Sequence, residues 1–129
     1  MKILTIITLF LFDFCNLNAQ QLNCEKFKNG EFEIRKDSIS KGSFISRNDS
    51  IQIERSNGSK DATELIVNWI DKCTYTLKPK DINLEEFNDL PENALLKVEI
   101  IEVKEDSYIQ KSSANFADYE IIKEVYLIK

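Results

Sequence analysis

The residue types that most often catalyse reactions or bind metals are scarce in this chain. It contains no histidine, which excludes His-based nucleophilic triads, His metal sites and His proton shuttles. Asp81, Asn83 and Glu85 alternate as oxygen ligands do in a calcium loop, but the glycine and the distal bidentate glutamate of that loop are missing. Carboxylates are abundant, yet no spacing marks two of them as a glycosidase pair. We therefore predict no catalytic residue, no metal site and no cofactor.

Three other side chains have the chemistry to hold a ligand. Arg47 ends an alternating stretch, where an inward guanidinium would hold a ligand carboxylate; the alternative is a surface arginine paired with an acid. Trp69 and Tyr75 would line an apolar pocket, or they would pack in the core beside a disulfide. We predict Arg47, Trp69 and Tyr75 as ligand-binding residues, with these alternatives open.

The first nineteen residues have the order of a secretory signal peptide. Lys2 supplies a positive charge, residues 3–12 are apolar except for two threonines, and Ala19 gives a small residue at the cleavage site. The apolar run is too short to cross a bilayer, which takes about 20 residues. We therefore expect a signal peptide over residues 1–19 and one β-rich domain over residues 20–129. The mature chain would be periplasmic or secreted and would have no transmembrane span.

The cysteines fit an oxidising compartment. The chain has three, Cys15, Cys24 and Cys73, and cleavage after Ala19 would leave an even pair. We predict a Cys24–Cys73 disulfide, with two buried free thiols as the alternative. Cys15 offers a second possibility, the lipid-modified cysteine of an outer-envelope lipoprotein. The bulky Phe14 before it matches that signal poorly.

The net charge limits the class of partner. The chain carries 17 basic and 22 acidic residues, a net charge of −5. Binding to a phosphate backbone or to an anionic membrane depends on clustered Lys and Arg. We therefore expect no nucleic-acid partner, and we expect either a small apolar ligand or another envelope protein.

The hydrophobic pattern has a period of two along most of the mature chain, which is typical of half-buried strands. The few glycines and prolines fall between the alternating segments, and Asn57-Gly58 is the strongest hairpin signal. One helical turn is expected within residues 23–30 and another at 84–87. The last strand is apolar on both faces, which indicates a covered strand or an edge that closes a barrel. The predicted strands are 31–35, 43–47, 51–54, 65–69, 73–77, 96–103, 108–112 and 119–128.

About eight short strands with tight connections predict a mainly antiparallel β fold. Hairpin connections make neighbouring strands antiparallel, so the strands should form a meander. A meander of this size closes into a small barrel or forms a strongly curved sheet. Sandwich packing stays open, because alternation alone does not separate it from a barrel.

Three segments resemble a family of small exported bacterial proteins of unknown function. The pattern is Cys-x-x-Phe-Lys-x-Gly-x-Phe at Cys24–Phe32, continues through Arg47–Glu54 and ends in Trp-x-x-x-Cys-x-Tyr at Trp69–Tyr75. The strand layout is also similar to that of lipocalin-type domains. This second resemblance implies a small lipocalin-like barrel.

These observations lead to two hypotheses about function. The first is an exported, non-enzymatic β-domain that binds a small apolar or amphipathic ligand in a cup-shaped sheet. The second is a cell-envelope protein–protein interaction module with a filled interior and no ligand pocket. An interior apolar cavity would favour the first hypothesis, and a solid core would favour the second. The absence of histidine and of a nucleophile motif disfavours an enzyme.

Overall fold

The structure is a computed structural model in which residues 22–128 are described. The predicted signal peptide and the alternative lipid anchor at Cys15 lie outside the described residues. Eight strands and two 3₁₀ turns are present in the described part. Their bounds are η2 Glu25–Phe27, β1 Gly30–Ile34, β2 Ser43–Arg47, β3 Ile51–Ser56, β4 Thr63–Trp69, β5 Thr74–Pro79, η3 Glu85–Phe87, β6 Leu96–Val103, β7 Ser107–Ala114 and β8 Glu120–Leu127.

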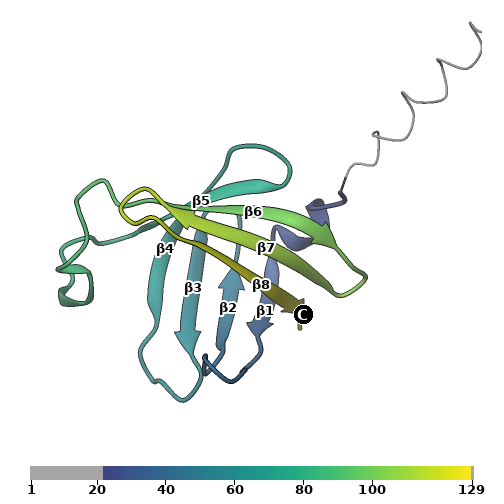
Figure 1. Ribbon diagram of the computed structural model, residues 1–129, viewed down its shortest axis with the longest axis horizontal. Helices are drawn as coiled ribbons and strands as arrows, with labels where there is room; N and C mark the ends of the chain where they lie inside the picture. The colour runs from purple at the N-terminus through teal and green to yellow at the C-terminus, as the bar shows by residue number, and fades with distance from the viewer. Residues whose placement is uncertain (1–21, 129) are drawn as a thin grey trace, which may run out of the picture.

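The strands form one closed antiparallel barrel. Each strand pairs with the next along the chain, and β8 pairs back onto β1. In Figure 1, β1–β4 stand side by side, and β6–β8 cross in front of them. The predicted small lipocalin-like barrel and its two short helical turns are thus confirmed. The sandwich alternative is wrong, because the ladder between β1 and β8 joins the two ends of the sheet.

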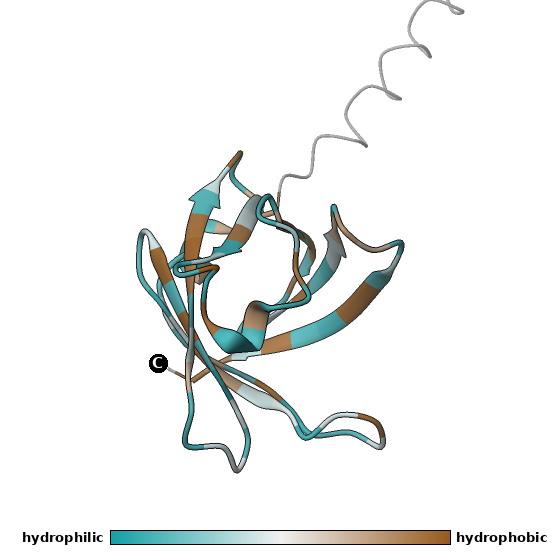
Figure 2. Cartoon of the chain, turned by 90° about the vertical axis from the view of Figure 1, so that its left-hand side faces the viewer, coloured by the Kyte–Doolittle hydropathy of each residue, from teal (hydrophilic) through white to brown (hydrophobic). Residues whose placement is uncertain are grey.

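The alternation in the sequence decides which side chains fill the barrel. In β4, Leu65 and Val67 are buried and Ile66 between them is half-buried, whereas Glu64 and Asn68 on either side are exposed. Antiparallel partners share a face, so Val67 lies opposite Leu77 of β5 on the inner side. The core therefore consists of every second residue of the strands, as the period of two predicted. Figure 2 shows the same alternation as apolar and polar bands along the strands.

The two ends of the barrel differ in their connections. At one end, which we call the closed end, residues 48–50, 70–73 and 104–106 make short turns, and η2 packs there with Phe27 fully buried. At the other end, the open end, the connections are 35–42, 57–62, 80–95 and 115–119. We call residues 80–95, which contain η3, the strap. Figure 1 shows the strap as the long excursion on the left of the view.

The wall of the barrel is weakest between β1 and β8. These strands share two residue pairs, Phe32 with Leu127 and Glu33 with Tyr126, whereas β7 and β8 share seven. Beyond these pairs the two strands separate toward the open end. Two side-chain contacts bridge that part: the Arg35 guanidinium lies 3.5 Å from the centre of the Tyr126 ring, and Lys123 Nζ lies 3.0 Å from Asp37 Oδ2.

The Asp37–Lys123 ion pair leads to a prediction about acid titration. The hydrogen bond from Lys123, with backbone N–H bonds from Ile39 and Ser40, lowers the pKa of Asp37 from 3.8 to about 2. A folded-state pKa below the unfolded one contributes stability above the unfolded pKa, and that stability is lost as the pH falls through the folded pKa. Lys123→Met should therefore raise the pKa of Asp37 toward its ordinary value.

An NMR titration of the Asp37 side-chain carboxyl carbon measures this shift. Lys104→Met is the matched control, because Lys104 pairs with Glu124 and not with Asp37. An Asp37 pKa that is the same in Lys123→Met and in the wild-type protein would show that the ion pair does not form.

Two glycines allow the loops at the open end. Gly42 has φ of +80°, and a Cβ there would lie 2.5 Å from the carbonyl oxygen of Ile34, so a larger residue is excluded both by conformation and by space. Gly58 has φ of +85° in the predicted turn between β3 and β4. The hairpin at Asn57-Gly58 is present, but its loop runs from residue 57 to 62, and Gly58 alone of the pair takes a positive φ.

One expectation about β8 is wrong. Its apolar residues on both faces predicted a covered strand, yet Ile121 is 45% exposed and Ile122 is 59% exposed. By alternation from the buried Val125, Ile122 points to the outer face of the barrel, and Ile121 points inward near the start of β8 at the open end. The other half of the prediction, an edge that closes a barrel, is confirmed.

Candidate functional site

A buried polar cluster centred on Arg47 lies at the closed end. Arg47 is the last residue of β2 and is 3% exposed. A guanidinium carries five N–H groups, and all five of these find an acceptor within the chain. Nε donates to Lys28 O (3.1 Å), Nη1 to Gln52 Oε1 (3.0 Å) and Tyr75 Oη (3.1 Å), and Nη2 to Phe27 O (2.6 Å) and Tyr108 Oη (3.0 Å).

The strand register explains why these groups meet. Arg47 lies opposite Gln52 in the β2–β3 ladder, so both side chains point into the barrel. Tyr75 and Tyr108 reach the same point from β5 and β7 on the other side of the barrel. The two carbonyl groups come from η2, which plugs the closed end. The arginine therefore links three parts of the chain that are far apart in sequence.

Aromatic rings surround the same guanidinium. Its carbon lies 4.6 Å from the centre of the Phe32 ring, 4.9 Å from that of Tyr75 and 5.9 Å from that of Tyr108. A cation over an aromatic face is attracted by the ring quadrupole, and more strongly where water is excluded. The cluster thus stabilises a buried positive charge with neutral oxygens and aromatic faces.

Among the described residues, no carboxylate makes an ion pair with Arg47. Gln52 connects it to the nearest acid of the network, because Gln52 Nε2 lies 3.5 Å from Glu54 Oε2. Burial raises the pKa of the Glu54 carboxyl, against the lowering effect of Gln52, Ser43 and the Arg47 charge. Burial also raises the pKa of Tyr75 well above its usual value, so its hydroxyl stays protonated.

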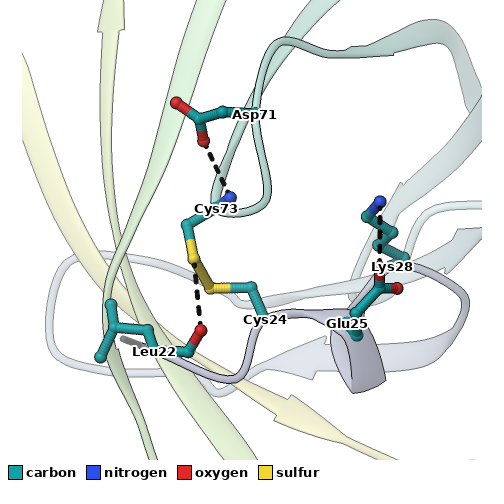
Figure 3. Close-up of a disulfide and its surroundings, with 6 residues drawn as sticks. All are labelled: Leu22, Cys24, Glu25, Lys28, Asp71 and Cys73. Atoms are coloured by element: carbon teal, nitrogen blue, oxygen red, sulfur yellow. Dashed lines mark hydrogen bonds and ion pairs between the residues drawn. A yellow bond between two sulfur atoms is a disulfide. The ribbon is translucent and has the colours of Figure 1, made fainter. Parts of the chain in front are cut away.

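The predicted disulfide is present next to this cluster. Cys24 and Cys73 are joined with an S–S distance of 2.08 Å and a Cα–Cα distance of 5.4 Å. Figure 3 shows that the bond ties the segment before η2 to the turn between β4 and β5. Asp71 Oδ1 accepts a hydrogen bond from the Cys73 backbone N–H (2.9 Å), which fixes that turn. The disulfide therefore holds the plug of the closed end in place.

The rings of Trp69 and Tyr75 pack against each other at a tilt of 46°. Their ring centres are 4.6 Å apart, and the ammonium of Lys28 lies 5.2 Å from the centre of the Trp69 ring. Trp69 packs against both core clusters of the barrel, in agreement with the core-packing alternative. Its Nε1–H is buried and has no acceptor among the described residues.

The structure thus brings Arg47, Trp69 and Tyr75 together at one end of the barrel. A ligand-binding role for these three residues stays a prediction. A ligand carboxylate would have to displace one of the five acceptors that Arg47 already has. The alternative of a surface arginine paired with an acid is wrong, since the side chain is buried among neutral partners.

The sequence did not mark Gln52, Phe27, Tyr108 or the acceptor carbonyl of Lys28 as members of the cluster. Gln52, Phe27 and Tyr108 lie in segments whose strand or turn character was predicted, but nothing local marks them as partners of Arg47. The signal that could have found Gln52 is the Asn48-Asp49 turn, because a hairpin there places residues 47 and 52 opposite each other. Tyr108 has no such signal, since it is 61 residues from Arg47.

A second feature, an apolar cavity, lies at the open end beneath the strap. Its volume is about 70 Å³. Leu65 and Leu77 form its floor from inside the barrel, and Phe87 and Leu90 of the strap cover it. Every side chain that lines it is apolar: Leu65, Leu77, Pro79, Phe87, Leu90, Ala94, Leu95, Leu96 and Phe116. We call this space the mouth cavity.

The described residues hold neither a metal-binding cluster nor a membrane-spanning helix. Within residues 22–128, no three His, Cys, Asp or Glu side chains are grouped so that they could hold a metal ion. None of the helices in the described part of the chain is long and apolar enough to span a membrane.

The fold and the two ends together define the class of this protein. It is a small, disulfide-linked, eight-stranded antiparallel β-barrel with a polar plug at one end and an apolar cavity at the other. In comparisons with protein-family models, curated proteins and solved structures, nothing matches the chain.

Proposed function

We propose that this protein is an exported, non-enzymatic β-barrel that binds the apolar part of a small amphipathic ligand at its open end. The observation that carries the proposal is the mouth cavity, whose lining is entirely apolar. Apolar cavities of this kind stay dry and take up apolar groups. Export is supported by the Cys24–Cys73 disulfide, because such bonds persist in oxidising compartments.

The size of the mouth cavity indicates how a ligand would enter. Its volume of about 70 Å³ is roughly half of the ~150 Å³ that accommodates a benzene molecule in an engineered cavity. A longer apolar chain therefore needs the strap to move away from the barrel. The middle of the strap, residues 81–92, is suited to this, because it belongs to no strand and contacts the barrel through side-chain packing of Phe87 and Leu90. Hydrogen bonds to Glu64 and Asn115 hold the two ends of the strap.

A fluorescent fatty acid tests the proposal. Undecanoic acid with a terminal dansyl group should increase its emission on binding to the wild-type protein. Leu90→Asp places a charge in the wall of the mouth cavity and should weaken binding at least tenfold, about 1.4 kcal/mol. Leu84→Asp is the matched control, because Leu84 lies on the same strap but is 46% exposed and does not line the cavity.

Equal binding by the two variants, or no change in dansyl emission with the wild-type protein, would refute the proposal. Native mass spectrometry of protein purified from its source then identifies the natural ligand through a co-purifying small molecule. The intact mass from the same measurement reports whether residues 1–19 have been removed.

A further inference from the structure

A second hollow surface lies on the outside of the barrel, over β4 and β5. Two adjoining hollows of about 550 Å³ and 350 Å³ share Ile66, Lys78 and Leu95 in their walls. We call this surface the outer groove. Ile66 and Lys78 alternate with the inward Leu65 and Leu77 and so point outward, away from the mouth cavity. Pro79, Ala94 and Leu95 border both spaces.

The outer groove combines apolar side chains, among them Ile66, Ile70 and Leu95, with polar ones. Ile66 lies opposite Lys78 in the ladder, and Asn68 lies opposite Thr76. Thr76 points outward and yet is only 9% exposed, so neighbouring side chains already enclose the floor. Ile70, at the end near the disulfide, is 58% exposed. An exposed isoleucine beside an enclosed floor is the pattern of a docking surface.

Hydrogen bonds from one residue hold the wall of the groove in place. Asn115 Oδ1 accepts from the Leu95 N–H (2.9 Å), and the Asn115 N–H donates to the Leu95 carbonyl oxygen (3.1 Å). Asn115 Nδ2 also donates to the carbonyl oxygen of Asn93 (2.8 Å). The segment that forms this wall is therefore fixed before any partner binds, which lowers the entropic cost of binding.

The charge at the centre of the outer groove indicates which partner fits. The side-chain ammonium of Lys78 makes no ion pair or hydrogen bond with any other residue in the range 22–128. Its neighbour Lys80 is bound to Glu64 at 2.9 Å, and Glu92 lines the far end of the smaller hollow. A chain with a net charge of −5 thus presents a free cation in the middle of this groove. The complement of this surface is a carboxylate next to aliphatic side chains.

From these observations we infer that the outer groove binds an extended acidic segment of another protein, with aliphatic side chains on the groove floor and a carboxylate at Lys78. The stretch from Ile66 to Ile70 is about 13 Å long at the rise of a strand, which matches about four residues of an extended peptide. Both edges of β4 and of β5 are already paired with neighbouring strands in the closed barrel. The segment therefore binds through side chains and not as an added strand. This inference does not depend on the proposed ligand in the mouth cavity.

A labelled peptide tests the inference. The probe is a fluorescein-labelled hexapeptide of alternating leucine and aspartate, and its fluorescence anisotropy measures binding to the full protein. Lys78→Glu should raise the Kd at least tenfold, and Lys78→Met, which keeps the aliphatic stem, should raise it severalfold. Lys41→Glu makes the same change in net charge on the distant 35–42 loop and should leave the Kd within twofold. Leu90→Asp should also leave it unchanged, because Leu90 lines only the mouth cavity.

Three results would overturn the inference. The first is the absence of peptide binding up to about 1 mM, the upper limit of weak specific affinity. The second is equal affinity for a hexapeptide of alternating leucine and lysine, or equal affinity of the Lys78→Glu and Lys41→Glu variants. The third is binding of the wild-type protein, but not of Lys78→Glu, to phosphatidylglycerol vesicles without peptide binding, which would assign the groove to a membrane surface. Trp69 fluorescence confirms that each variant is folded.

Discussion

Replacing Arg47 with methionine is expected to lower the free energy of unfolding by about 4 kcal/mol. Methionine fills much of the same space but donates no hydrogen bond, so five acceptors at the closed end lose their partner. Each buried polar group left unsatisfied costs about 1–3 kcal/mol, and the two tyrosine hydroxyls can turn toward other acceptors to recover part of this. The carbonyl groups of Phe27 and Lys28 have no such freedom, and they carry most of the loss.

Urea unfolding followed by the fluorescence of Trp69, the single tryptophan, measures this change. Arg55→Met is the control, because Arg55 is an exposed arginine of the neighbouring strand β3, where surface substitutions change stability by about 0.5 kcal/mol or less. Arg47→Lys keeps the charge but has three donors, so the stability of this variant should fall between those of the wild-type protein and Arg47→Met. A gain in stability with Arg47→Met would contradict our account and favour the ligand-binding prediction for Arg47, since binding sites often cost stability.

Removing the disulfide with the double substitution Cys24→Ser and Cys73→Ser is expected to have an effect of similar size. The bond joins residues that are 49 apart in sequence, and the chain-entropy model gives about 4 kcal/mol for a loop of that length. A structural consequence adds to this loss. Without the bond, η2 is freer to leave the closed end, and it takes with it the buried Phe27 ring and two of the acceptors of Arg47.

Urea unfolding of the wild-type protein with and without dithiothreitol measures the loss, again through Trp69. The double serine variant serves as the control, because its unfolding midpoint should not respond to dithiothreitol. Equal midpoints for oxidised and reduced wild-type protein would show that η2 is held by Arg47 and by packing alone. The two large predictions are coupled through η2. The loss of stability in the triple variant (Arg47→Met with both serine substitutions) should therefore be smaller than the sum of the two separate losses.

The sequence allowed the strands and the disulfide to be predicted for physical reasons that are local. A strand with one buried face must alternate, and an even number of cysteines in an oxidising compartment tends to pair. Turn residues at Asn48-Asp49 and the prolines Pro79 and Pro91 interrupt the alternation, so the breaks between strands also have local signals in the sequence. These features depend on neighbours within a few residues of each other.

The register at which the barrel closes and the partners of Arg47 could not be predicted, because both depend on residues far apart in the chain. Alternation indicates that Tyr75 and Tyr108 point inward, but it does not fix the height at which they meet across the barrel. The ladder between β1 and β8 pairs Phe32 with Leu127, and no local sequence pattern predicts that contact. The exposure of Ile122 could not be predicted either, because apolar residues on both faces of β8 do not show which face is left uncovered.

The short ladder between β1 and β8 also determines where this fold opens first. The Ile128 N–H donates to the Glu31 carbonyl oxygen, so it points toward β1. Every second N–H of a strand points to the same side, so the Ile122 N–H also points toward β1. At the height of Ile122, however, β1 has already ended. In deuterium oxide the amide of Ile122 should therefore exchange early, while that of Val125, which is fully buried, stays protected. Local opening of the barrel therefore starts along the edge between β1 and β8, before any of the hairpins separate.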